Sequence, residues 1–319
     1  MNIYKYSPIV PLLSILLMNS TAVYANQNKF VQTSMDVSLG SIHLEALEKV
    51  YDDGFLLSQL EWTTQQSPLL SSIINFKYGP KFTFQLKGAF SSSGEGELYD
   101  YDWINPTSYG VTNSFENWTH KSHSNTELKY YYQVGFKAFY QLFHKNNLDL
   151  KGLLNAQRIS MDWDAVGGTY IYSSGGAGFR GASGSFANGV GINYGQTWDT
   201  FALGIDASTD YEDYSFHFAP QYGINTNIHD QDIHVLRGIT FNEDLAEKGG
   251  STFLALDVKA NKHISKSMDA YAVYSYENHF EGKGETDVCG AHQCSHFSGD
   301  AAGASLKTHS FMIGLTIKD

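Results

Sequence analysis

The sequence predicts an all-β fold, a ten-stranded antiparallel transmembrane β-barrel with long extracellular loops. Aromatic residues make up 14% of the 319 residues and charged residues only 17%, a balance that suits a surface meeting both lipid and water. Several stretches alternate between apolar and polar residues, which is the period of a β-strand. After the first 25 residues, no run is apolar enough for a membrane-spanning helix. Only helices and closed barrels satisfy every backbone polar group in lipid, so a membrane fold here must be a barrel.

The amino-terminal segment has the pattern of a signal peptide. Lys5 is its only charged residue, an apolar stretch runs over residues 9–18, and Val23-Tyr24-Ala25 offers tolerated residues at the cleavage positions. The apolar stretch has about half the length that a spanning helix needs. We therefore expect residues 1–25 to be a signal peptide and residues 26–319 to form one outer-membrane barrel domain.

The clearest alternation runs over residues 127–143. These seventeen residues exceed the roughly 5–6 of an ordinary strand in a soluble domain, which favours a barrel over a soluble sandwich. We expect the apolar set to face lipid and the polar set to face the lumen. The apolar set is Leu128, Tyr130, Tyr132, Val134, Phe136, Ala138, Tyr140 and Leu142, and the polar set is Lys129, Gln133, Lys137 and Gln141.

The connections between the alternating stretches predict the topology. Short turns are expected at residues 79–80, 144–147, 209–213 and 262–267, with longer loops between the partners at the other end. Outer-membrane barrels have this asymmetry, with short periplasmic turns and long external loops. Counting through the turns gives about ten strands. Other alternating stretches are Leu148 to Ala156, Phe201 to Ala207, Tyr214 to Tyr222, Phe253 to Val258, Ala270 to Tyr276 and Phe311 to Ile317.

Charge and cysteine content narrow the function classes. Lys and Arg total 21 against 33 Asp and Glu, a formal net charge of −12, so the broad basic surface that nucleic acid requires is absent. The only cysteines are Cys289 and Cys294, and in an exported chain we expect a local disulfide between them. His292 and His296 lie beside them, but this spacing matches no zinc pattern well, so we expect no metal site.

Two short polar motifs are the candidates for chemistry. Asp100 and Asp102 are two residues apart and therefore share one face of a strand, where one carboxyl can hold a proton for acid–base work. Asp232 and His234 have the same spacing, so the carboxylate can orient the imidazole. Each motif alone also fits solvated surface groups. Both motifs, however, lie in loops that follow strands running toward the extracellular side, so they can meet at the extracellular mouth of the barrel. No G-x-S-x-G elbow and no Walker loop occurs.

At these residues the sequence resembles the omptin family of bacterial outer-membrane aspartyl/histidine proteases. The resemblance implies a ten-stranded barrel with an active-site groove at its extracellular top. It also implies that Asp232 and His234 activate a water molecule, and that Asp100 and Asp102 form the facing acidic pair. The stretches that carry it are Asp36-Val37-Ser38-Leu39-Gly40, Ser58-Gln59-Leu60-Glu61-Trp62, Gly167-Gly168-Thr169-Tyr170-Ile171-Tyr172-Ser173, and Gly184-Ser185-Phe186 with Asn188-Gly189.

The resemblance further implies the substrate and the surroundings. Glu48 and Asp230 align with acids that line the family's pocket for a basic P1 side chain, so peptides and host proteins with Arg or Lys are the expected substrates. Glu48 could instead balance the charge of neighbouring Lys49. No cofactor is expected, lipopolysaccharide is expected as an activator, and the protein is expected to be a monomer with a role in virulence and its active site outside the cell.

The sequence also departs from the family pattern. Thr119 stands where omptins carry an acid that shapes the next subsite, and Lys121 replaces a nearby serine. Ser160 and Thr197 stand where the family's arginines bind lipid phosphates, although Arg158 is close by. These changes motivate an alternative, a surface adhesin or binding barrel with reduced or lost proteolytic activity. A diffusion pore is a weaker reading, because about ten strands leave a lumen largely filled by side chains.

Overall fold

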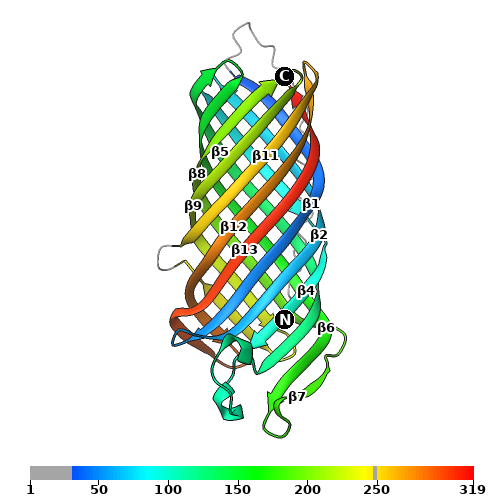
Figure 1. The fold of residues 1–319 in the computed structure, drawn as a ribbon, viewed down its shortest axis with the longest axis vertical. Helices are drawn as coiled ribbons and strands as arrows, with labels where there is room; N and C mark the ends of the chain where they lie inside the picture. Colours follow the sequence, from blue (N-terminus) through cyan, green and yellow to red (C-terminus); the bar gives the residue numbers. More distant parts are fainter. Residues whose placement is uncertain (1–30, 247–249) are drawn as a thin grey trace.

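A computed structural model describes residues 31–246 and 250–319 (Figure 1). The expected signal peptide lies outside the described residues. The described chain is almost entirely β-strand, with two short 3-10 helices, which confirms the predicted all-β class. No described helix has the length and apolar character needed to cross a bilayer.

The strands form one antiparallel ring, closed where the first strand pairs with the last. Apart from the three interrupted strands described below, segments that follow each other in the chain also pair with each other in the ring. The strands are β1 (Val31–Asp52), β2 (Phe55–Tyr78), β3 (Phe82–Ser91), β4 (Glu95–Asp102), β5 (His120–Lys145), β6 (Leu148–Ser174), β7 (Gly178–Ser185), β8 (Val190–Tyr211), β9 (Tyr214–His234), β10 (Ile239–Asp244), β11 (Ser251–Ser265), β12 (Met268–Cys289) and β13 (Cys294–Lys318), and the 3-10 helices are η2 (Pro106–Tyr109) and η3 (Phe115–Asn117).

Three pairs among these thirteen segments are successive parts of one strand. β3 and β4 both pair with β2 and β5, and β10 and β11 both pair with β9 and β12. β7 and β8 likewise both pair with β6. When each pair is counted as one interrupted strand, the ring of described residues has ten strands.

The two ends of the barrel differ. At the end where the chain finishes, short turns join β2 to β3, β5 to β6, β8 to β9 and β11 to β12, at the four predicted places (Figure 1). At the other end, β6 and β7 protrude beyond the ring together with the segment that carries η2 and η3. We call these the turn end and the loop end. Most of the length expected in loops at this end lies in extended strand ends. Only two to four residues join β1 to β2, β6 to β7, β9 to β10 and β12 to β13, whereas residues 103–119 join β4 to β5.

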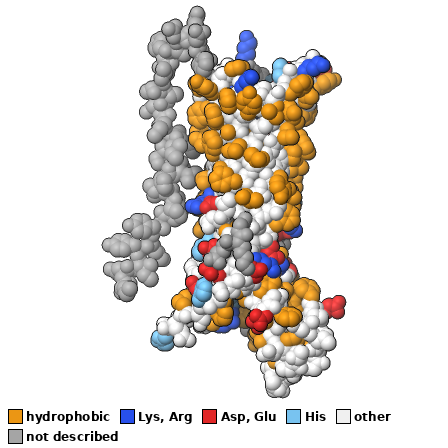
Figure 2. Space-filling view, turned by 90° about the vertical axis from the view of Figure 1, so that its left-hand side faces the viewer, with side chains coloured by type: hydrophobic (Ala, Val, Ile, Leu, Met, Phe, Trp, Pro, Cys, Tyr) orange, Lys and Arg blue, Asp and Glu red, His pale blue; other side chains and the backbone are white. Residues whose placement is uncertain are grey.

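An apolar belt surrounds the half of the barrel nearer the turn end. Leu39, Leu142, Leu203 and Ile313 are each more than half exposed on it. Figure 2 shows these hydrophobic side chains covering the turn half, while acidic side chains gather toward the loop end. A continuous apolar band around a barrel is the surface that a bilayer requires. The loop half therefore lies outside the membrane-spanning segments.

The alternation in β5 changes phase at one residue. Leu128, expected to face lipid, is 3% exposed and belongs to the interior cluster, whereas the side chain of Lys129, expected in the lumen, is 47% exposed. The register of β5 against β6 shifts between Leu128 and Tyr130, so Lys129 sits in a β-bulge. A bulge adds one residue to one strand and reverses which face the following residues occupy. From Val134 to Leu142 the predicted faces hold.

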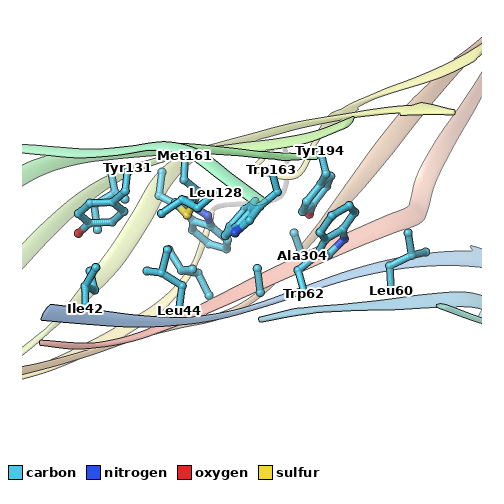
Figure 3. Packing of buried hydrophobic residues seen from close by; sticks show 14 of the residues in the cluster. Ile42, Leu44, Leu60, Trp62, Leu128, Tyr131, Met161, Trp163, Tyr194 and Ala304 are labelled. Carbon is cyan, nitrogen blue, oxygen red and sulfur yellow. The ribbon is translucent and has the colours of Figure 1, made fainter. Parts of the chain in front are cut away.

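Inside the barrel an apolar plug separates the two ends. Its rings are Trp62, Trp163 and Tyr194, and the ring of Trp62 stacks on that of Tyr194 with centroids 5.0 Å apart (Figure 3). The indole nitrogen of Trp163 donates to Thr64 Oγ1 at 2.8 Å. Leu44, Leu128 and further apolar side chains fill the space between these rings.

Between the plug and the turn end the lumen is polar. A cavity of about 400 Å³ there is lined by ion pairs such as Lys137–Asp257 and Lys259–Asp36, both at 2.8 Å. Buried charges are tolerated inside a membrane barrel when they are paired in this way. The plug thus separates the charged lumen at the turn end from the inner faces of the loop end, where the candidate residues lie; we call this loop-end region the groove.

Candidate active site

Asp232 and His234 form a hydrogen-bonded pair at the loop end of β9. Alternation puts both side chains on the inner face of the strand. His234 Nε2 lies 2.7 Å from Asp232 Oδ2, and Asp232 is only 1% exposed. The ring of His234 packs on Phe241 of β10, with centroids 5.5 Å apart. The carboxylate therefore fixes the ring orientation, as a general base requires.

A tight turn directly after the pair brings a guanidinium onto the imidazole. The backbone nitrogens of Arg237 and Gly238 both donate to the carbonyl of His234, and Gly238 has a φ of 62°, which glycine adopts without strain. In this turn Arg237 Nη2 contacts His234 Nδ1 and lies 3.1 Å from Nε2. Arg237 is not among the residues predicted from the sequence. Its position three residues after His234 and before a glycine is the signal that could have revealed it.

Asp100 and Asp102 are on the inner face of β4, across the groove from β9. Ser122 Oγ donates to Asp100 Oδ2 at 3.4 Å. Burial, together with the charges of Asp102 and Asp232, raises the pKa of Asp100 well above its usual range. Burial also raises the pKa of Asp102, against the opposing charges of His120, Arg237 and His234. These mutual effects show that the two predicted motifs meet in one site.

The residues opposite the acidic pair are not those expected from the sequence. In the β4–β5 ladder Asp102 pairs with His120 and Asp100 pairs with Ser122. Thr119 is fully buried, and its hydroxyl donates to the carbonyl of Asp102. Lys121 points outward over the rings of Tyr99 and Tyr101, at 5.3 and 5.0 Å. The expected assignment of Thr119 and Lys121 to the groove is therefore wrong by one residue, which on a strand means the wrong face.

Three buried carboxyls form a pocket below the pair. Glu48 of β1, Asp230 of β9 and Glu243 of β10 are each at most 1% exposed, and Tyr194 donates to Asp230 Oδ2 at 3.0 Å. Glu48 Oε2 has no hydrogen-bond partner among the described residues. Burial and the neighbouring acids raise the pKa of Glu48 and of Glu243 well above the usual range. Burial raises the pKa of Asp230 to about 7.

This pocket is the part of the site best suited to a cation. Buried acids without counter-charges destabilise the folded chain, and a guanidinium or ammonium group would satisfy them. The sequence analysis placed Glu48 and Asp230 here but missed Glu243, which is directly opposite Asp230 in the β9–β10 ladder. The alternative partner for Glu48 is not found, because Lys49 points the other way and pairs with Glu281 at 3.0 Å.

The remaining candidate residues lie outside the groove. Arg158 makes a two-pronged contact with Asp199, at 2.6 and 2.5 Å, and Thr197 donates to Ser160 at 3.1 Å. Arg158 is thus a paired cation on the outer face. Cys289 and Cys294 are joined by a disulfide at the ends of β12 and β13.

The fold and its apolar belt together define an outer-membrane β-barrel, with a cluster of buried acids and an Asp–His pair at its loop end. The model of the Omptin family matches residues 29–318, so this chain belongs to the omptin family, as its resemblance suggested. The plasminogen activator of Yersinia pestis is 27% identical over 285 residues, 87% of this chain and 86% of that protein. Protease 7 of Escherichia coli O157:H7 is 26% identical over 292 residues, covering 89% of this chain and 88% of that one.

A solved structure shows the same fold. The crystal structure of the outer-membrane protease OmpT from Escherichia coli superposes with a TM-score of 0.83 at 23% identity, covering 90% of this chain and 97% of that one. The apolar belt, the closed ring and the family therefore agree that this is an outer-membrane protein.

Proposed function

We propose that this omptin is an endopeptidase that hydrolyses peptide bonds after Arg or Lys. The observation that carries the proposal is the 2.7 Å Asp232–His234 pair, which stands between the acidic pair on β4 and the three-carboxyl pocket. Relatives are described as proteases and a plasminogen activator, which supports the same reaction class.

In this mechanism a water molecule in the groove attacks the scissile carbonyl. Asp232 holds Nε2 of His234, which leaves Nδ1 as the ring nitrogen to accept a proton from that water. A carboxyl with a raised pKa, such as Asp100, carries a proton that it can give to the leaving amine. No acyl-enzyme forms, because no side chain acts as a nucleophile.

The pocket supplies the preference for a basic residue before the scissile bond. Its acids lie deeper in the barrel than the catalytic pair, since Asp230 is two residues further along β9 from the rim than Asp232. A long basic side chain can reach them while its own carbonyl stays at the level of Asp232 and Asp100. A neutral side chain would leave the buried acids unpaired, which gives selectivity by charge.

The membrane setting forms part of the proposal. We infer that the loop end faces the cell exterior, that one protomer carries a complete site, and that lipopolysaccharide on the belt supports activity. Arg158 is the basic residue nearest the expected lipid contacts. It can bind a lipid phosphate only if it gives up its ion pair with Asp199. A membrane-bound assay must therefore compare preparations with and without lipopolysaccharide.

The test is cleavage of an internally quenched peptide library by refolded protein, with cut positions read by mass spectrometry. Cuts after Arg or Lys are expected, and both His234→Ala and Asp232→Asn should abolish them while the barrel stays folded. Lys121→Gln is the matched control, because it removes a charge outside the groove.

Two results would count against the proposal. Full activity in both dyad variants would remove the assignment of the pair. Absence of cleavage by folded wild type, with and without lipopolysaccharide, would favour a binding barrel that has lost turnover.

A further inference from the structure

Charge is unevenly distributed along the groove. The deep side holds Glu48, Asp230 and Glu243, all buried and without an ion pair to any Lys or Arg among the described residues. The rim side holds two basic side chains, His120 and Arg237. The charge of Arg237 lowers the pKa of both Asp100 and Asp102 relative to burial alone, so its guanidinium lies near the acidic pair as well as near His234.

His120 is held with its ring in the groove. Its neighbour Thr119 uses its only hydroxyl proton on the carbonyl of Asp102, at 3.1 Å, so His120 Nδ1, 3.0 Å from that hydroxyl, must be the donor. The ring lies against Tyr172 of β6, with centroids 4.9 Å apart. Nε2 is then the ring nitrogen left to contact a ligand, and a protonated ring would present Nε2–H as a donor there.

Arg237 has no carboxylate partner among the described contacts. Its guanidinium instead contacts the ring of His234, a weak partner for a cation. That contact occupies Nδ1, the nitrogen that must accept the water proton. A carboxylate brought by the substrate would be a stronger partner for Arg237 and would free Nδ1.

Resting on the proposed function, we propose that His120 and Arg237 form a subsite for an acidic side chain directly after the scissile bond. The basic side chain before the bond enters the deep acidic pocket, so the residue after the bond lies on the rim side of the catalytic groups. There it meets the guanidinium of Arg237 and the imidazole of His120. The preferred cleavage sequence is therefore Arg or Lys followed by Glu or Asp. The carboxylate of the acidic residue binds Arg237 and thereby frees Nδ1 of His234.

The experiment uses three quenched peptides that differ only after the scissile bond. Each has Arg before the bond, followed by Glu, Gln or Lys, and kcat/KM is measured for the full-length refolded protein in lipopolysaccharide-containing micelles. Partly solvated ion pairs contribute up to about 1 kcal/mol, so the Glu peptide should exceed its isosteric Gln peptide by about fivefold, and the Lys peptide should be the poorest.

The variants assign the preference to residues. Arg237→Gln should reduce the Glu-to-Gln ratio to about one, and His120→Asn should lower it partly. Lys121→Gln is the control, since Lys121 neighbours His120 but points away from the groove, and it should keep the wild-type ratio. Folding of each variant is checked by its heat-modifiable migration on gels.

Several outcomes would overturn the inference. If wild type cleaves the Gln or Lys peptide as well as the Glu peptide, the acidic subsite is refuted while the endopeptidase proposal stands. A ratio changed equally by Lys121→Gln and Arg237→Gln would also refute it, because the effect would then be general surface charge. Failure of wild type to cleave all three would remove the proposed function and this inference with it.

Discussion

Substrate binding should depend on pH through Asp230. A carboxyl whose pKa is raised to about 7 is about one tenth ionised at pH 6 and about nine tenths ionised at pH 8. Glu48 and Glu243 have pKa values raised well above the usual range and hold their protons longer. If a basic side chain binds only the ionised pocket, its affinity should rise about tenfold between these two pH values.

Binding can be separated from catalysis with the inactive His234→Ala variant. Fluorescence anisotropy would compare a labelled peptide that carries Arg with one that carries citrulline, its neutral isostere. The Arg peptide should bind about tenfold more tightly at pH 8 than at pH 6, and the citrulline peptide should not. A citrulline peptide that follows the same pH curve would refute the reasoning, because charge in the pocket would then not be what titrates.

Tyr194 offers an internal check on the same mechanism. Its hydroxyl donates to Asp230 at 3.0 Å and lowers the pKa of that carboxyl relative to burial alone. In Tyr194→Phe the carboxylate loses this donor, so the midpoint of the binding curve should move to higher pH. An unchanged midpoint would show that the titrating group is not Asp230.

Three further predictions concern the barrel. Asp230 has a raised pKa in the folded state, so its bound proton stabilises the folded barrel fully below its unfolded pKa of about 4. This stabilisation is lost as pH rises to about 7. Asp230→Asn should therefore raise the free energy of unfolding at pH 8 but not at pH 3. Leu44 is fully buried in the plug, so Leu44→Ala should cost about 2–5 kcal/mol in denaturant unfolding in micelles. A cysteine at Lys129 should react with a water-soluble maleimide, whereas one at Leu128 should not, and equal labelling would contradict the bulge.

The fold class and the turns could be predicted because lipid imposes a simple rule on the outer face. Between Val134 and Leu142 alternation alone gives the correct faces. The rule weakens in the loop half, where the inner face is also apolar. Leu128 and Trp163 are interior residues there, and one bulge at Lys129 is enough to exchange the two faces. The apolar–polar period of one strand does not reveal a bulge. Which face each residue of β5 occupies before the bulge is therefore known only from its pairing with β6.

The site was predicted where two polar residues share one strand, as in Asp232 with His234. Residues contributed by a neighbouring strand were missed, because their positions depend on register. Glu243 joins Asp230 through the β9–β10 ladder, and His120 joins Asp102 through the β4–β5 ladder. In the second case an error of one residue selected Thr119, which supports the backbone instead of facing the groove.

The plug and the active site share a residue, which explains why the barrel is closed at this level. Tyr194 stacks on Trp62 in the plug and also donates to Asp230 in the pocket. Rigid aromatic packing below the pocket fixes that hydroxyl, keeps bulk water from the buried acids and so sustains the raised pKa values. An open lumen would hydrate these carboxyls and lower their pKa toward ordinary values. Closure of the channel is therefore a condition for the chemistry at the loop end.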